Sequence, residues 1–88
     1  MGDRFRATVK EVIDGDTFKT ANTIRLENVN APELDKPGGK AAKEKLEELI
    51  LNKEVVYEEQ ARDDYKRIIA QVWINSKNVN GAMNEFLK

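Results

Sequence analysis

The chain has 88 residues, which is room for one domain spanning residues 1–88, and its 40% hydrophobic content is enough to build a core. It contains no cysteine and no histidine, which excludes disulfides, thiolate nucleophiles, zinc–cysteine sites and imidazole acid–base chemistry. Its 15 basic and 16 acidic residues give a net charge of −1, which argues against a protein that coats nucleic acid non-specifically.

The first third of the chain predicts three strands. Apolar and polar residues alternate from Phe5 to about Ile13, and Asp14-Gly15 is a turn signal. Residues 17–20 and 23–29 predict two more strands, separated by a turn at residues 21–22. Two successive hairpins would form a three-stranded meander.

The remaining residues predict a loop, two helices and two further strands. Residues 30–39 contain both prolines and form a loop, and residues 40–52 show a helical stripe made by Ala42, Leu46, Leu49 and Ile50. Residues 54–59 and 65–74 predict strands, residues 75–78 a turn, and residues 79–87 a short amphipathic helix.

This order of elements predicts a mainly β, α+β domain. Five strands with a helix between the third and fourth, followed by a short C-terminal helix, are typical of an OB-fold barrel. OB folds bind oligonucleotides among other ligands, but a fold alone does not assign a function.

The first motif that could carry chemistry is Asp14-Gly15-Asp16-Thr17. An Asp-Gly pair is a strong hairpin signal, so an ordinary turn is one interpretation. In the other interpretation, Asp16 presents a carboxylate oxygen to a hard cation such as Ca²⁺.

The second motif covers residues 24–33. Arg25 lies between apolar neighbours and should leave the sheet on the face opposite to them, where it is either solvated or free to bind an anion. Asn30, Glu33 and the backbone carbonyl of Ala31 flank Pro32 and could form an oxygen cluster suited to Ca²⁺. The alternative is a simple turn leading into the helix.

The third motif is Asp63-Asp64-Tyr65-Lys66-Arg67. One interpretation is a charged connection that keeps a strand edge soluble. The other is a phosphate site in which Arg67 binds bidentately beside Tyr65.

Together, from about Phe5 to about Leu87, these motifs resemble the staphylococcal nuclease (thermonuclease) family, with its DGDT turn, arginine strand, Pro-Glu step and Asp-x-Tyr-x-Arg segment. The resemblance implies a Ca²⁺-dependent nuclease that cuts single-stranded DNA and RNA and leaves 3′-phosphate ends. It also implies catalysis by Arg25, Glu33 and Arg67, a Ca²⁺ site from Asp16, Asn30 and the Ala31 carbonyl, and substrate binding by Tyr65 and both arginines.

The chain departs from the family pattern at several positions. Asn30 replaces an aspartate that ligates the metal, Asp64 replaces a lysine, Lys66 replaces a glycine, and the prototype continues beyond Lys88 with a third helix. These departures favour an alternative, a catalytically weakened module that binds nucleic acid or protein. We expect a monomer without a signal peptide or membrane span. The compartment stays open between the cytoplasm and a processed secreted form.

Overall fold

The computed structural model describes residues 3–88, in which strands outnumber helices seven to two. Their bounds, in chain order, are β1 (Arg4–Thr8), β2 (Glu11–Asp14), β3 (Thr17–Lys19), β4 (Thr23–Leu26), α1 (Gly39–Ile50), β5 (Glu54–Arg62), β6 (Ile68–Ile74), β7 (Lys77–Asn78) and α2 (Val79–Leu87). The prediction of a mainly β, α+β domain with a helix in mid-chain and a short C-terminal helix is confirmed.

All strands belong to one sheet with the order β1-β5-β6-β4-β3-β2, and β7 pairs with β6. β4 and β6 run parallel, and the other pairs are antiparallel. Within residues 3–88, no ladder joins β1 to β2, so the pairings form an open path whose two end strands are consecutive in the chain. A closed barrel therefore stays a prediction.

The strand predicted over residues 5–13 is two strands, because the chain changes partner at Val9 and Lys10. The N–H of Val9 donates to the carbonyl of Lys53 (2.9 Å), and the carbonyl of Val9 accepts from the N–H of Asn52 (3.0 Å). The N–H of Lys10 donates instead to Lys19 (2.8 Å) on β3. This change and the short β7 explain why seven strands replace the predicted five.

Further boundaries differ from the prediction, and one of them is the end of β5, which runs to Arg62 instead of residue 59. Residues 65–67 lie in the loop before β6, because Lys66 adopts a φ of 64° that a strand does not accommodate. β4 ends at Leu26 rather than at residue 29, since Asn28 also has a positive φ of 61°. The predicted turn at residues 75–78 contributes its last two residues to β7.

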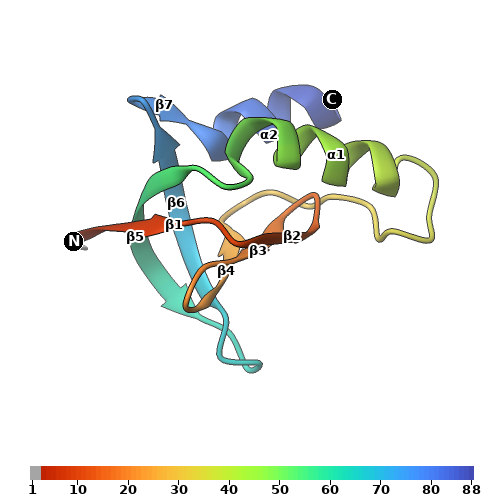
Figure 1. Ribbon diagram of the computed structural model, residues 1–88. Coiled ribbons are helices and arrows are strands. Elements are labelled where there is room, and N and C mark those ends of the chain that lie inside the picture. Colours follow the sequence, from red (N-terminus) through yellow and green to blue (C-terminus); the bar gives the residue numbers. More distant parts are fainter. Residues whose placement is uncertain (1–2) are drawn as a thin grey trace.

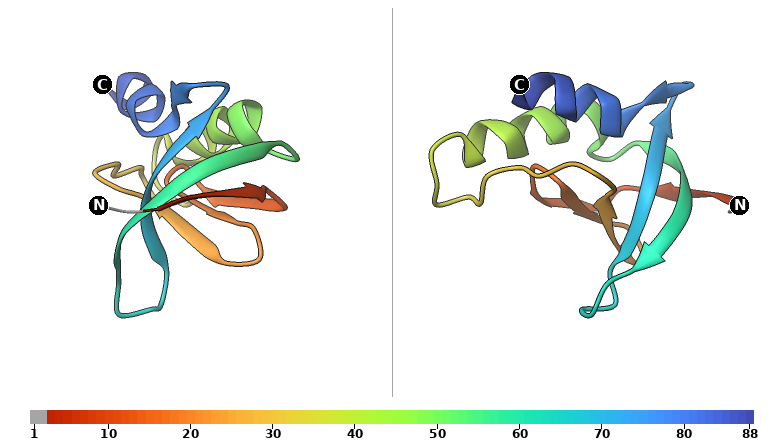
Figure 2. Two further views of the ribbon diagram at one scale, coloured as in Figure 1. Left: turned by 90° about the vertical axis from the view of Figure 1, so that its left-hand side faces the viewer. Right: turned by 180° about the vertical axis from the view of Figure 1, so that it is seen from behind.

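The core lies between the sheet and the two helices, which pack side by side across one end of the sheet (Figures 1 and 2). From α1, Ala42, Leu46 and Ile50 are fully buried, whereas Leu49 of the predicted stripe is only partly buried. The loop between β5 and β6 extends away from the helices in every view (Figures 1 and 2). Neither described helix is long and apolar enough to cross a membrane.

Candidate functional site

The hairpin between β2 and β3 holds the carboxylate of Asp16 in a fixed, buried position. The backbone N–H of Asp16 donates to Oδ1 of Asp14 (3.1 Å) across the turn, which restrains the backbone of Asp16. The hydroxyl of Thr17 donates to Oδ1 of Asp16 (2.9 Å), and only 7% of Asp16 is exposed. These contacts fix the orientation of the Asp16 carboxylate before any ligand binds.

Gly15 allows two other segments to approach this hairpin. A Cβ on Gly15 would lie 2.6 Å from the Cβ atoms of both Ala31 and Ala42, so the loop after β4 and the first turn of α1 pack directly on the glycine. Gly15 does not adopt a positive φ. The Asp-Gly pair therefore forms the hairpin that sequence predicts, but its glycine is needed for close packing rather than for a left-handed turn.

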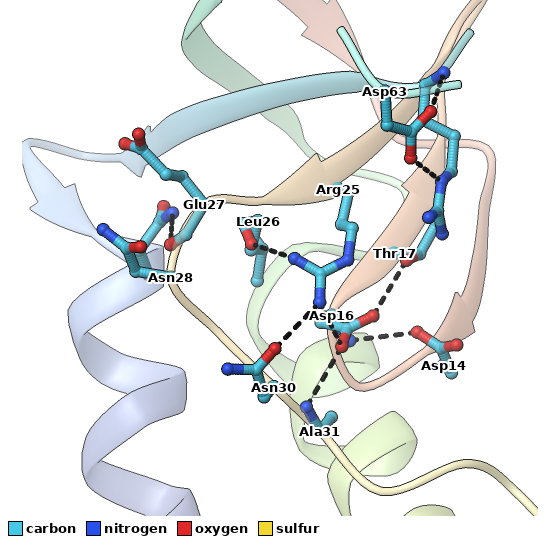
Figure 3. Close-up of polar contacts among 12 residues, drawn as sticks. Asp14, Asp16, Thr17, Arg25, Leu26, Glu27, Asn28, Asn30, Ala31 and Asp63 are labelled. Carbon is cyan, nitrogen blue, oxygen red and sulfur yellow. Dashed lines mark hydrogen bonds and ion pairs between the residues drawn. The ribbon is translucent and has the colours of Figure 1, made fainter. Parts of the chain in front are cut away.

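Ala31 ties the loop after β4 to the buried carboxylate. Its backbone N–H donates to Oδ2 of Asp16 (3.0 Å), across 15 residues of chain (Figure 3). The structure thus places Ala31 beside Asp16 and shows an N–H contact. That the carbonyl of Ala31 binds a metal stays a prediction.

The guanidinium of Arg25 completes this cluster. Its Nη2 donates to Oδ1 of Asn30 (3.1 Å) and lies 3.5 Å from Oδ2 of Asp16, while Nη1 donates to the carbonyl of Leu26 (3.2 Å; Figure 3). The carboxylate and the amide oxygen therefore converge on one cationic nitrogen. Arg25, Asn30 and Ala31 of the second sequence motif therefore come together with Asp16 of the first.

Two carboxylates crowd the same turn. Burial raises the pKa of Asp14 above its ordinary value, and the neighbouring carboxylate of Asp16 adds to the increase. Hydrogen bonds from the Asp16 N–H and the Thr17 hydroxyl act in the opposite direction without cancelling it. A cation near this turn would relieve the repulsion between the two acids.

Arg67 lies in the loop between β5 and β6, where Asp63 holds it. Oδ2 of Asp63 accepts from Nε of Arg67 (2.6 Å), and Oδ1 accepts from the backbone N–H of Arg67 (2.9 Å; Figure 3). Oδ1 also accepts from the backbone N–H of Tyr65 (3.0 Å). Tyr65 is 81% exposed, and its ring centroid lies 5.7 Å from the guanidinium carbon of Arg67. The loop thus presents an aromatic ring and a cation to solvent.

Arg25 lies on β4, and Arg67 immediately precedes β6, the strand that pairs with β4. In the β4–β6 register Ile24 lies beside Ile68 and Arg25 beside Ile69, and both Ile24 and Ile68 are buried in the core. Because successive residues of a strand point to opposite faces, Arg25 faces away from the core. Arg67 is the last loop residue before Ile68, at the start of the strand that pairs with β4.

Glu33 is not part of the cluster. Its side chain is exposed and makes no hydrogen bond or ion pair with any residue from 3 to 88. Its carbonyl accepts from the N–H of Lys36 (2.9 Å), and the chain folds back so tightly that a Cβ on Gly39 would meet this carbonyl oxygen. The predicted catalytic role of Glu33 would require its side chain to turn toward Asp16.

Sequence reasoning assigned no role to Asp63, which makes three hydrogen bonds in the site. The sequence does contain a signal for this role. An aspartate side chain often accepts from the backbone N–H two residues later, and here an arginine follows four residues after it. Within residues 3–88, no group of three or more acidic side chains gathers in a way that would hold a metal by charge alone.

Comparison with known proteins identifies relatives of this chain. A family model described as "Staphylococcal nuclease homologue" matches residues 23–85. The chain is 32% identical to Protein ParB of Escherichia coli over 92 residues, covering 89% of this chain and 52% of that protein. It is 35% identical over 81 residues to an uncharacterized endonuclease of Escherichia coli (85% and 53%), and 30% identical over 78 residues to one of Haemophilus influenzae (82% and 44%). The chain thus spans about half the length of these curated relatives.

Proposed function

Because this chain belongs to the staphylococcal nuclease homologue family, we propose that it is a nuclease that hydrolyses phosphodiester bonds of single-stranded DNA and RNA with Ca²⁺ and leaves 3′-phosphate ends. Two relatives are named endonucleases, which supports the proposal. The observation that carries it is the convergence of Asp16 and Asn30 on the guanidinium of Arg25, on β4, the strand that pairs with β6 directly after Arg67.

The arginines would bind and stabilise the phosphodiester. Its negative charge repels a nucleophile, and two guanidinium groups spread that charge as it grows in the transition state. A guanidinium group does not give up its proton readily, so neither arginine is assigned the role of general acid. Tyr65, beside Arg67 and exposed, would contact the nucleotide next to the phosphate.

Glu33 would act on the water. An exposed carboxylate of this kind can orient a water molecule or accept its proton. Glu33 follows Pro32 in the loop that Ala31 ties to Asp16, so a rotation of its side chain is the movement required. No hydrogen bond of the Glu33 side chain within residues 3–88 opposes that rotation.

The donor set of the cluster fits calcium. Oxygens of Asp16 and Asn30 already converge on one cationic nitrogen, and carboxylate, amide and carbonyl oxygens are the ligands that Ca²⁺ prefers. Asp16, Asn30 and the Ala31 carbonyl would hold the ion. When bound, calcium would polarise a phosphoryl oxygen and help to neutralise its charge. The guanidinium of Arg25 would then be released to bind the phosphate.

The proposal is tested by incubating the protein with labelled single-stranded DNA and RNA, with Ca²⁺ or with EDTA, and analysing the ends of the products. Calcium-dependent cleavage with 3′-phosphate ends is expected. Binding of the oligonucleotides without cleavage under both conditions would contradict the nuclease function and support the alternative, a module that only binds.

A further inference from the structure

The loop between β5 and β6 uses the two oxygens of Asp63 for different purposes. Oδ1 accepts two backbone N–H groups, those of Tyr65 and Arg67, and so belongs to the turn. Among residues 3–88, Oδ2 accepts only from Nε of Arg67, at 2.6 Å. One oxygen therefore serves the backbone and the other serves the arginine side chain.

The backbone of the loop does not depend on the Oδ2 contact. The N–H of Asp63 donates to the carbonyl of Arg67 (3.1 Å), and the N–H of Lys66 donates to the carbonyl of Asp63 (3.0 Å). With the two bonds to Oδ1, these contacts close the hairpin loop by themselves. The bond from Nε to Oδ2 adds an orientation of the guanidinium and no further closure.

This orientation leaves the other edge of the guanidinium available. Arg67 uses Nε for Asp63, and its terminal nitrogens donate no hydrogen bond to any residue from 3 to 88. The guanidinium has five N–H donors in a fixed plane, so fixing Nε also fixes the direction of the other four. An N⁺–H···O⁻ bond of this length is charge-assisted and strong enough to favour one rotamer.

We propose that Asp63 is a positioning residue that holds the guanidinium of Arg67 in the orientation needed to bind phosphate, an inference that rests on the function proposed above. A free arginine side chain loses rotamer freedom when it binds. Because Asp63 restricts the Arg67 side chain before the phosphate arrives, less of that freedom is lost on binding. Displacing a binding group by about 1 Å can cost roughly 100-fold in rate.

The test uses Asp63→Asn, which separates the two oxygens. Asparagine keeps Oδ1 as the acceptor for the backbone N–H groups, but it replaces Oδ2 by an NH₂ group that cannot accept from Nε. The matched control is Glu59→Gln. Glu59 pairs with Arg62 (2.9 Å) on the same hairpin, so this variant removes the same charge and breaks a neighbouring arginine pair.

We expect Asp63→Asn to lower kcat/KM for a single-stranded DNA oligonucleotide by roughly 10- to 100-fold, with the circular dichroism spectrum unchanged. Glu59→Gln should stay within about twofold of the wild type, as expected for an exposed ion pair. In an Arg67→Ala background, Asp63→Asn should cause no further loss, because it acts through Arg67. Equal effects of Asp63→Asn and Glu59→Gln, or a further loss in the Arg67→Ala background, would overturn the inference.

Binding measured in EDTA separates this inference from the proposed function. If the wild type binds the oligonucleotide but does not cleave it in Ca²⁺, the nuclease function fails. The role of Asp63 then stands if Asp63→Asn weakens binding as much as Arg67→Ala does, and it falls if Asp63→Asn binds like Glu59→Gln. A wild type that neither binds nor cleaves contradicts both proposals.

Discussion

Nη2 of Arg25 lies 3.5 Å from Oδ2 of Asp16, so a cationic side chain of the protein itself neutralises the carboxylate proposed to bind calcium. The same nitrogen donates to Asn30. A bound ion and the guanidinium would therefore compete for the same oxygens, and the phosphate that Arg25 is proposed to bind would draw it away from them.

Replacing Arg25 by glutamine should change cation binding and cleavage in opposite directions. Ca²⁺ should bind roughly 30-fold more tightly, because removing a unit charge about 4 Å from a divalent ion is worth about 2 kcal/mol even at the dielectric of water. Cleavage should fall by roughly 100- to 1,000-fold, since one charge-stabilising donor is lost. Calorimetric titration and a digestion assay measure the two effects. Unchanged or weaker Ca²⁺ binding would mean that Arg25 and the ion do not share these oxygens.

Asn30→Asp should strengthen the same site. The change keeps the shape of the side chain and adds one anion, and Ca²⁺ affinity follows the number of charged ligands, so binding should tighten by roughly 10- to 100-fold. Cleavage at low calcium should rise in parallel. Asn28→Asp adds the same charge two residues away, where the side chain makes none of the contacts of the cluster, and serves as the control. If both variants bind calcium equally, Asn30 does not face the ion.

Gly15→Ala should destabilise the protein through packing. The new Cβ would lie 2.6 Å from the Cβ atoms of Ala31 and Ala42, so the loop after β4 or the start of α1 must move. Overpacking of this kind costs about 1 to 3 kcal/mol of unfolding free energy. Denaturant unfolding measures the change in the free energy of unfolding. A variant as stable as the wild type would show that the loop after β4 or the start of α1 can move without cost.

The pH dependence of stability should reflect the crowded carboxylates of the β2–β3 hairpin. The pKa of Asp14 is raised, so the folded state binds more protons between the ordinary and the raised pKa, and stability decreases as pH rises through that range. Asp14→Asn keeps an acceptor for the Asp16 N–H and removes this decrease of stability with rising pH. Without calcium, the variant should therefore gain stability over the wild type at pH 7 relative to pH 3. A difference that is independent of pH would contradict this account.

The pKa of Asp63 is shifted in the direction opposite to that of Asp14. Desolvation raises its pKa, but hydrogen bonds from the backbone and side chain of Arg67 and from the Tyr65 N–H outweigh this and lower it. Its contribution is therefore present above the unfolded pKa near 3.9 and is lost as pH falls through the folded value. The stability difference between the wild type and Asp63→Asn should shrink below about pH 4, whereas the one for Asp14→Asn changes in the other direction.

The sequence predicts much of this arrangement, because the strands carry clean alternation and Arg25 lies at a strand position whose outward face follows from that alternation. Arg25 follows from Ile24 and Leu26, and the second helix is found at its observed bounds. Long-range contacts are harder to predict. The change of partner at Val9 depends on residues 52 and 53, and the N–H of Ala31 meets Asp16 across 15 residues.

The conformations of single residues in loops are also hard to predict from the sequence. The conformation of Glu33 depends on a loop whose closure needs the contact between Gly39 and the Glu33 carbonyl, and no periodic pattern encodes that contact. Lys66 has a left-handed backbone conformation, and its N–H donates to the carbonyl of Asp63. The sequence pattern alone does not predict this conformation. On α1, Leu49 fits the predicted helical stripe but is only partly buried, whereas Ala42, Leu46 and Ile50 of the same stripe are fully buried.

The most direct test of the account compares the wild type with Arg67→Ala for cleavage of single-stranded DNA in Ca²⁺, with circular dichroism melting of both proteins. The account predicts cleavage by the wild type that EDTA abolishes. It also predicts a loss of roughly 100- to 1,000-fold in Arg67→Ala with the fold retained, because the arginine lies in an exposed loop outside the core. Equal cleavage by both proteins, or loss of the fold in Arg67→Ala, would contradict the assignment of Arg67 to phosphate stabilisation.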